Sequence, residues 1–130
     1  MKLDLIILKD TYGIYQLDNK SKVPGWMKSS DFYSFTRTPD EISIVCKQSV
    51  IKAPDKGIVD KNWKIIKVRG TLNLSLTGII AEITGVLGKS KIPVFTISTY
   101  NTDFILVKEE NLDKTITILK NNGHKIFSEK

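Results

Sequence analysis

Two short polar segments hold the side chains and backbone groups of this chain that are best suited to binding a small molecule. Residues 73–78 (Asn-Leu-Ser-Leu-Thr-Gly) precede an apolar pattern of helical period, and residues 98–103 (Ser-Thr-Tyr-Asn-Thr-Asp) separate two apolar runs. The first amide groups of a helix lack partners within it and carry partial positive charge, so they suit a ligand carboxylate. In the second segment, Asp103 and backbone carbonyls could hold an amino group.

Each segment also has a purely structural interpretation. Gly78 would permit tight packing of a strand against a helix as readily as close approach of a ligand. Asn101 and Asp103 are residue types that satisfy the backbone of a turn without any ligand. Residue spacing alone therefore favours the structural interpretation at both segments.

Residues suited to catalysis or to metal binding are few. The sequence has one histidine, His124, and one cysteine, Cys46, so we expect no zinc site and no intrachain disulfide. Cys46 lies in an apolar run and is expected to be a buried thiol. His124 follows a predicted helix, and a histidine at such a position more often caps the helix end than acts as a base. With no Gly-x-Ser-x-Gly, P-loop or Gly-x-Gly-x-x-Gly motif, we expect no catalytic residue, no metal, no cofactor and no enzymatic activity.

The net charge of +6 would permit contact with nucleic acid or acidic lipid. The lysines, however, are mostly scattered singly along the chain, as solvated surface residues are. No apolar run is long enough for a signal peptide or a membrane span. We therefore expect a cytoplasmic protein that binds neither membrane nor, in its main role, nucleic acid.

The first half of the chain is predicted to contain strands and turns but no long helix. Turn residues dominate 20–30, and Thr-Pro-Asp-Glu at 38–41 predicts a hairpin. Residues 48–61 are expected to be irregular, because Pro54 and Gly57 interrupt them. Runs rich in apolar and aromatic residues predict strands at 3–9, 11–17, 32–36 and 42–47.

The second half predicts a βαββαβ order, which is a split βαβ sandwich with an antiparallel sheet. Apolar residues at helical spacing run from Thr77 to Gly88, with Ser75 or Thr77 as the N-cap. Asn111 is expected to cap a second helix, which Gly123 ends. Strands are predicted at 63–69, 92–100, 104–108 and 124–127, with a tight turn at 101–103. The fold class is thus α+β.

The element order, together with three segments of sequence, resembles the ACT domain, an amino-acid-binding regulatory module. Residues 32–41 (FYSFTRTPDE), 76–81 (LTGIIA) and 97–107 (ISTYNTDFILV) resemble bacterial tandem-ACT proteins and each half of the CASTOR arginine sensors. The resemblance spans nearly the whole chain. It implies two ferredoxin-like ACT modules with helices on one face of each sheet. These are a degenerate N-terminal module at 1–60 and an ACT domain at 61–130.

The resemblance also implies a ligand site between two ACT modules, under the loop that enters the first helix and opposite a strand end. Backbone groups would hold the carboxylate and amino groups of a free amino acid, and Asp103 is a candidate for the latter. The arginine sensors have an acidic residue where this chain has Leu76, which cannot pair with a guanidinium, so a small or apolar amino acid is expected. The implied ligand-binding residues are Asn73, Leu74, Ser75, Leu76, Thr77, Gly78, Ile79, Thr99, Tyr100, Asn101, Thr102 and Asp103.

The arginine sensors fuse two copies of a unit like this chain, so the resemblance implies a homodimer with equivalent sites. Exposed apolar residues such as Val94 or Tyr100 would then lie in the interface. Ligand binding would signal allosterically, through altered packing or a protein partner. The alternatives are a protein-interaction module without a ligand, an RNA-binding α/β module using Phe95 and Tyr100, and a small enzyme with Asp103 or His124 as base.

Overall fold

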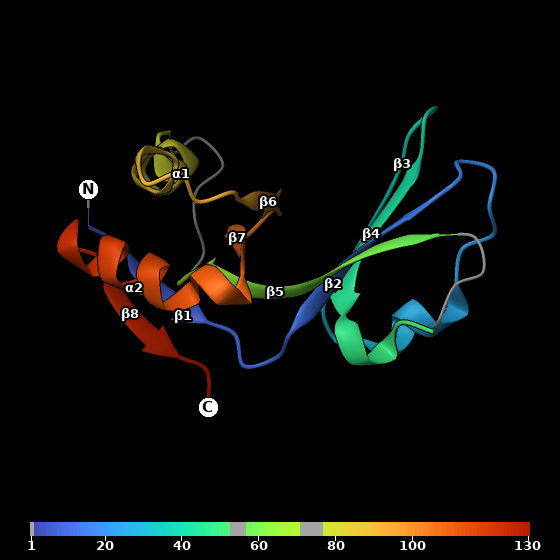
Figure 1. The fold of residues 1–130 in the computed structure, drawn as a ribbon, viewed down its shortest axis with the longest axis horizontal. Coiled ribbons are helices and arrows are strands. Elements are labelled where there is room, and N and C mark those ends of the chain that lie inside the picture. The colour runs from blue at the N-terminus through green and yellow to red at the C-terminus, as the bar shows by residue number, and fades with distance from the viewer. Residues whose placement is uncertain (1, 53–56, 71–76) are drawn as a thin grey trace. The chain divides into compact units, whose positions relative to one another are not determined.

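The computed structural model describes residues 2–52, 57–70 and 77–130, and the chain divides into two compact units. Unit 1 comprises Met1–Lys9 and Lys64–Lys130, and unit 2 comprises Asp10–Trp63 (Figure 1). The chain therefore passes from one unit to the other twice, once after Lys9 and once after Trp63.

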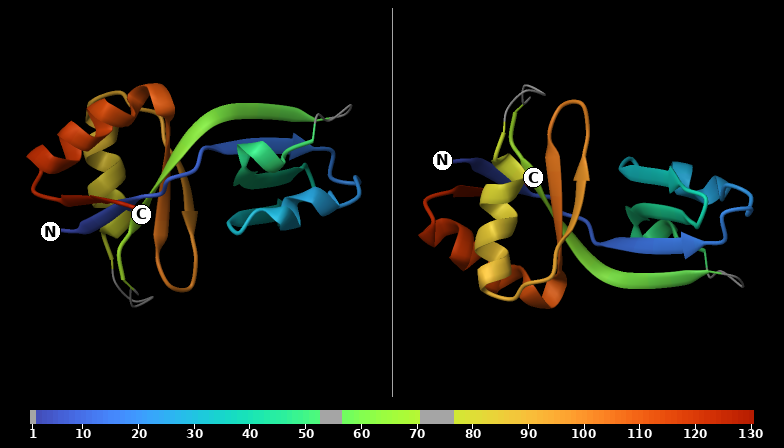
Figure 2. Two further views of the ribbon diagram at one scale, coloured as in Figure 1. Left: turned by 90° about the horizontal axis from the view of Figure 1, so that it is seen from below. Right: turned by 90° about the horizontal axis from the view of Figure 1, so that it is seen from above.

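Unit 1 is a sheet with two α-helices packed on one face. The strands are β1 (Asp4–Ile7), the C-terminal part of β5 (Ile58–Val68), β6 (Phe95–Ser98), β7 (Asp103–Lys108) and β8 (Lys125–Ser128), in the order β6-β7-β5-β1-β8. The helices are α1 (Ile79–Lys89) and α2 (Leu112–Asn121), preceded by the short η3 (Glu109–Asn111). Figure 2 shows both helices lying against these strands. From β5 onward this is the βαββαβ order that the sequence predicts.

Alternation along the strands of unit 1 explains why the helices share one face. In β1, in the C-terminal part of β5 and in β7, alternate residues on one face are apolar and buried, because successive strand residues point to opposite faces of a sheet. These residues form one cluster with the apolar stripes of both helices, and its buried members include Leu5, Ile66, Val68, Ile83, Leu87, Ile105, Val107 and Leu119.

The ends of the helices differ in part from the prediction. Gly78 occupies the N-cap position of α1 with φ of 83° and has no side chain with which to cap the helix, so Thr77 as the N-cap was wrong. A left-handed residue is needed there, which glycine supplies without steric cost. Asn111 does occupy the N-cap position of α2, but its side chain makes no capping hydrogen bond. Gly123 follows α2 with φ of 90°, as expected of a helix end. The predicted cap Ser75 lies outside the described residues.

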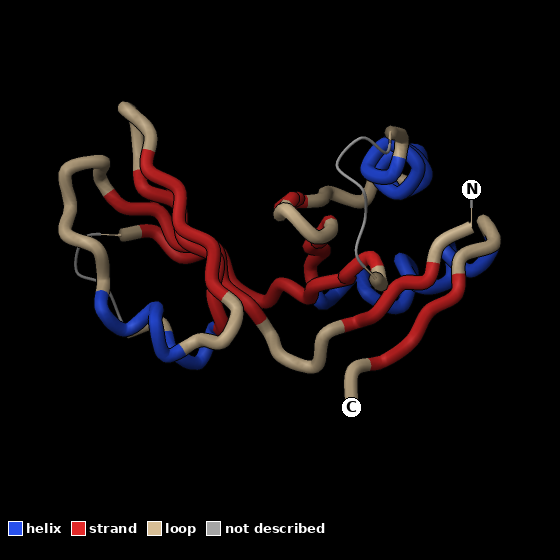
Figure 3. The backbone as a smooth tube through the Cα atoms, turned by 180° about the vertical axis from the view of Figure 1, so that it is seen from behind, coloured by secondary structure: helices blue, strands red, loops and turns tan. Residues whose placement is uncertain are grey.

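Unit 2 is an antiparallel sheet in the order β3-β4-β2-β5, formed by β2 (Tyr12–Leu17), β3 (Tyr33–Arg37), β4 (Ile42–Lys47) and the N-terminal part of β5. Figure 3 shows the two short 3-10 helices of this unit, η1 (Gly25–Ser29) and η2 (Gln48–Val50), beside the strands. The hairpin predicted at 38–41 is confirmed, because Thr38 N–H donates to Glu41 O at 2.8 Å. The buried core of this unit comprises Tyr15, Leu17, Met27, Ile42, Ile44 and Cys46.

Two differences from the sequence prediction have a common cause in strand pairing. Strand β5 begins at Ile58, five residues before its predicted start, because its polar first part pairs with β2. The register of that pairing shifts near Asn62, whose φ of 68° marks a bulge. Strand β1 pairs with β5 and with β8 in unit 1, whereas the expected boundary after residue 60 groups it with the N-terminal module.

Candidate functional site

The turn between β6 and β7 closes on itself through two threonines. Ser98 and Asp103 are paired across the hairpin, so the turn consists of residues 99–102, one more than the tight turn predicted at 101–103. Thr99 donates to Thr102 O from its N–H at 2.9 Å and from its hydroxyl at 3.1 Å. Thr102 N–H in turn donates to Thr99 Oγ1 at 3.3 Å. The turn therefore has a defined shape without a ligand.

Thr102 also attaches this turn to the end of β5. Its side chain is only 3% exposed, and its hydroxyl donates to Val68 O at 2.7 Å. Val68 is the last residue of β5, the strand that leads through Gly70 into residues 71–76. The β6–β7 turn is thus fixed beside the strand end from which the helix-entry segment departs.

The N-cap residue of α1, Gly78, supplies no side-chain hydrogen bond to the first backbone amides of the helix. Thr77 and Gly78 are exposed, whereas Ile79 is buried in the core of unit 1. The first amides of a helix lack partners within it and carry partial positive charge, which favours an anionic group. Ile79 is therefore positioned for packing, and only its backbone could contribute to a site.

The remaining predicted residues of the turn differ in their surroundings. Tyr100 is 78% exposed and Asn101 is also exposed, so both side chains project from the turn. Asp103 is half-buried, and its Oδ1 accepts a hydrogen bond from the Ser98 hydroxyl at 2.5 Å. The structure thus brings Thr99, Tyr100, Asn101, Thr102 and Asp103 together. The predicted Asn73, Leu74, Ser75 and Leu76 lie outside the described residues.

Sequence reasoning missed Arg69. It is exposed at the end of β5, directly after the acceptor of the Thr102 hydrogen bond, and its guanidinium lies 4.6 Å from the centre of the Phe127 ring. Such stacking holds a guanidinium in place while leaving its N–H groups directed outward. A sequence signal was available, because Arg69 is a cation between the end of a predicted strand and Gly70, which leads towards the predicted helix.

His124 is buried, and its backbone N–H donates to Leu119 O at 3.1 Å, so it caps the end of α2 as expected. Its side chain has a second structural role. Its ring Nδ1 accepts the Leu3 N–H at 3.1 Å, and its Nε2 lies 3.5 Å from Glu82 Oε1. Because Nδ1 is an acceptor, the neutral ring carries its proton on Nε2, facing the carboxylate. His124 thereby joins the start of β1 to α1 within unit 1.

Cys46 is buried as predicted, and desolvation raises the pKa of its thiol to about 11.

Neither a metal cluster nor a membrane span is found in the described part of the chain. Among residues 2–52, 57–70 and 77–130, no group of three or more histidine, cysteine, aspartate or glutamate residues is arranged to hold a metal ion. No helix in those ranges has the length and apolar character needed to cross a membrane. A pocket in unit 2 contains none of the predicted site residues.

Two family models match the chain. A model described as "ACT domain" matches residues 58–121, and a model of an N-terminal domain matches residues 10–53. The first match covers β5, both helices and the β6–β7 turn. The second falls within unit 2.

Similar proteins include sensors and regulatory enzymes. The human "Cytosolic arginine sensor for mTORC1 subunit 1" is 30% identical over 98 residues, which cover 71% of this chain and 30% of the sensor. The chain thus spans about a third of the length of that relative. A crystal structure of a protein from Agrobacterium tumefaciens is 35% identical with a TM-score of 0.91, covering 100% of this chain and 96% of that one. Aspartate kinase from Clostridium acetobutylicum shares the fold, with a TM-score of 0.64 at 15% identity over 87% of this chain and 33% of the kinase.

Proposed function

Because the chain belongs to the ACT domain family, we propose that it is a regulatory protein that binds a free amino acid and is not itself an enzyme. The observation that most directly supports this proposal is the hydrogen bond from Thr102 to Val68 O, which fixes the β6–β7 turn beside the strand that leads to α1. The relative named as a cytosolic arginine sensor supports both the sensing role and a cytoplasmic location.

In this proposal, the ligand carboxylate binds the backbone amides at the start of α1. The turn supplies the partner of the ammonium group, with the Asp103 carboxylate beside Ser98 as the acceptor. Arg69 provides a second positive group near the carboxylate end. The predicted Leu76 leaves a ligand guanidinium without an acidic partner, so the ligand is a small or apolar amino acid rather than arginine.

A second copy of the chain completes the site in this proposal. The ligand would lie between two ACT modules of a homodimer, with unit 2 as the degenerate module of each chain. The exposure of Tyr100 at the β6–β7 turn supports an interface there, because a large aromatic side chain is usually covered. Ligand binding would favour one packing of the subunits, and a protein partner would detect that packing.

A thermal-shift screen of the full chain against the twenty amino acids tests this proposal. A ligand that binds only the folded state adds about 2.7 kcal/mol at 100-fold above its Kd. For a chain of this size, that raises Tm by several degrees. Asp103→Asn should abolish the shift, whereas Asp40→Asn, a matched change at an exposed hairpin residue of unit 2, should preserve it.

The screen also separates the proposal from its main alternative. The hydrogen bonds that Thr99 and Thr102 make to each other would serve equally in a protein-interaction module that binds no ligand. No shift with any of the twenty amino acids, for a protein whose circular dichroism shows it to be folded, would favour that module. The same outcome would count against a sensor.

A further inference from the structure

Unit 2 contains a pocket of about 640 Å³ whose lining combines charged and aliphatic side chains. This volume is in the range of pockets that bind small molecules. We propose that the pocket binds a small molecule in which one carboxylate is joined to an aliphatic group, at a site separate from that of the ACT domain. All of its lining residues in the described part of the chain belong to unit 2, which the ACT family model covers only from residue 58.

The aliphatic part of the pocket is formed by Ile51 and Val59. Both are half-buried and pack against the apolar core of unit 2. Gly13 of β2 lies beneath them, and a Cβ at that position would come within 2.6 Å of Ile51 Cδ1 and 3.6 Å of Val59 Cγ1. The lack of a side chain at Gly13 therefore lets these two residues settle onto the sheet. They form a surface on which the hydrocarbon part of a ligand loses contact with water.

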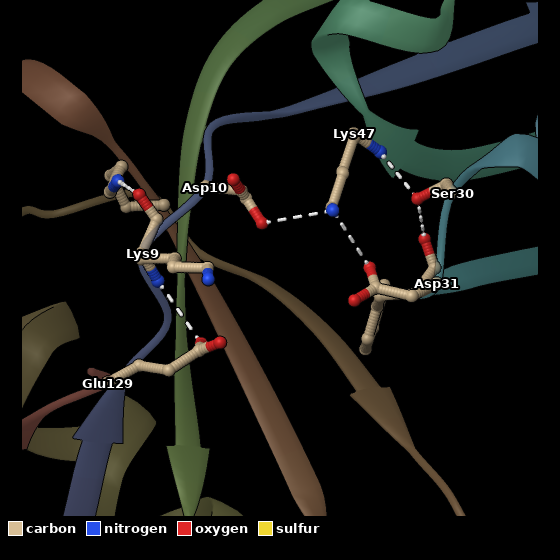
Figure 4. Close-up of polar contacts among 8 residues, drawn as sticks. Lys9, Asp10, Ser30, Asp31, Lys47 and Glu129 are labelled. Carbon is tan, nitrogen blue, oxygen red and sulfur yellow. Dashed lines mark hydrogen bonds and ion pairs between the residues drawn. The ribbon is translucent and has the colours of Figure 1, made fainter.

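Lys47 is the cation that the structure holds in place at this pocket. Its Nζ lies 3.3 Å from Asp10 Oδ2 and 3.2 Å from Asp31 Oδ1 (Figure 4). Its backbone N–H donates to Ser30 Oγ at 3.0 Å, and that hydroxyl donates to Phe32 O. The two carboxylates raise the pKa of Lys47, which favours the charged form of its ammonium. An ammonium has three N–H donors, and these carboxylates use two.

The balance of charge in the lining favours a monoanion. Among the described lining residues, Lys47 and Lys61 contribute positive charge, and Asp10 is the only acidic side chain. Asp31 pairs with Lys47 from outside the described lining, and its own side chain is 79% exposed, so solvent screens its charge. A singly charged carboxylate suits this balance, whereas a multiply charged anion would lose more hydration energy against Ile51 and Val59.

The wall that carries Ser49 is also fixed before any ligand binds. Gln48 N–H donates to Thr11 O at 2.9 Å, which ties η2 to the start of β2. The Gln48 side chain accepts the Asn62 N–H at 2.7 Å and donates to Asn62 Oδ1 at 3.2 Å, which ties η2 to β5. A pocket whose walls are already joined requires little ordering on binding, which favours affinity for a small ligand.

An NMR titration of the ¹⁵N-labelled full chain tests the proposal with three probes. Isovalerate has a carboxylate on a branched aliphatic body, isoamylamine has a similar body with a positive charge, and inorganic phosphate has charge without an aliphatic group. Isovalerate should shift the amide signals of Thr11, Ser49 and Ile51 in a saturable manner. Isoamylamine and phosphate should not. Equal responses to isovalerate and isoamylamine, or no saturable response to isovalerate, would overturn the proposal.

Variants locate the binding and separate it from net charge. Ser49→Trp fills the pocket without removing a charge, and Lys61→Met removes one cation but keeps the aliphatic stem; each should weaken isovalerate binding about tenfold or more. Lys125→Met, the same change at an exposed residue of β8, should leave it unchanged. Equal weakening by the two methionine variants would contradict the proposal. If Ser49→Trp does not fold, the pair of methionine variants still decides.

A further variant distinguishes binding at the unit 2 pocket from binding at the ACT site. Asp103→Asn alters the β6–β7 turn in unit 1 and none of the lining of the unit 2 pocket. The isovalerate response of Thr11, Ser49 and Ile51 should therefore persist in this variant. Its loss would assign the ligand to the ACT site and reject a second one.

Discussion

The two units use strand β5 in different ways. In unit 1, the second part of β5 is largely buried, and its alternate residues Ile66 and Val68 belong to a core shared with two helices. In unit 2, the first part is mostly exposed, beginning with Ile58 at 70% exposure. A candidate site in unit 1 consequently depends on backbone groups at the ends of packed elements. The pocket of unit 2 depends instead on charged side chains, among which Lys47 is held by ion pairs with Asp10 and Asp31.

The largest expected effect is in the core of unit 1. Ile105→Ala removes a fully buried side chain of β7 from the cluster beneath the two helices. The loss of apolar burial and the cavity left behind should lower the free energy of unfolding by about 2–5 kcal/mol. Urea unfolding followed by circular dichroism measures this. A loss of less than about 1 kcal/mol would show that the core of unit 1 is not packed as described.

Two glycine substitutions should have opposite signs in the two units. In unit 2, a Cβ at Gly57 would lie 2.5 Å from Tyr15 Oη, and Tyr15 is buried, so Gly57→Ala should destabilise the protein by about 1–3 kcal/mol. In unit 1, Gly85 lies on the exposed side of α1 with no atom within 4 Å of an added Cβ. Gly85→Ala should stabilise the protein by about 0.5–1 kcal/mol, because alanine favours a helix. Thermal unfolding measures both, and changes of the same sign would contradict this difference.

Thr102→Val tests the attachment of the β6–β7 turn. The substitution keeps the shape of the side chain but leaves Val68 O without its 2.7 Å donor in a buried position. Unfolding free energy should fall by about 1–3 kcal/mol, and amino-acid binding should weaken as well. Thr96→Val, at an exposed position of β6, is the control and should change neither quantity by more than about 0.5 kcal/mol. If Thr102→Val bound the amino acid with full affinity, the hydrogen bond from Thr102 to Val68 O would not be needed for the site.

The smallest expected effect is the pH dependence of the ion pairs in unit 2. Lys47 lowers the pKa of Asp31, so the stabilisation from Asp31 is present above its unfolded pKa and is lost as pH falls through the lower folded value. Asp31 and Asp10 raise the pKa of Lys47, so the stabilisation from Lys47 is present below its unfolded pKa and is lost at strongly alkaline pH. The difference in Tm between wild type and Lys47→Met should therefore be greatest between these limits. A difference that grows in acid would contradict the ion pairs.

Sequence patterns predicted the elements best where one face of the element is buried. Ile42–Lys47 was predicted with its observed bounds, and the βαββαβ order from β5 onward was predicted, because alternation and helical spacing are clear in these segments. The early start of β5 was missed, because residues 58–62 are held by pairing with β2 rather than by burial. The partner strands of β1 were also beyond sequence reasoning, since pairing across more than 50 residues leaves no local signal.

The candidate site was predicted in part. The segment that became the β6–β7 turn was identified from its polar residues, but its attachment to Val68 through Thr102 follows from the packing of distant strands. Arg69 was overlooked because a single charged residue at a strand end is common. The pocket of unit 2 was not foreseen, since Asp10, Asp31 and Lys47 lie far apart in the chain and meet only when the sheet forms.

An NMR titration of the ¹⁵N-labelled full chain with the amino acid that gives the largest thermal shift tests the central claim most directly. We expect saturable shifts centred on Gly78, Ile79 and residues 99–103, which are lost in Asp103→Asn and retained in Asp40→Asn. Saturable shifts confined to unit 2, with the β6–β7 turn and the start of α1 unaffected, would contradict an amino-acid site in the ACT domain.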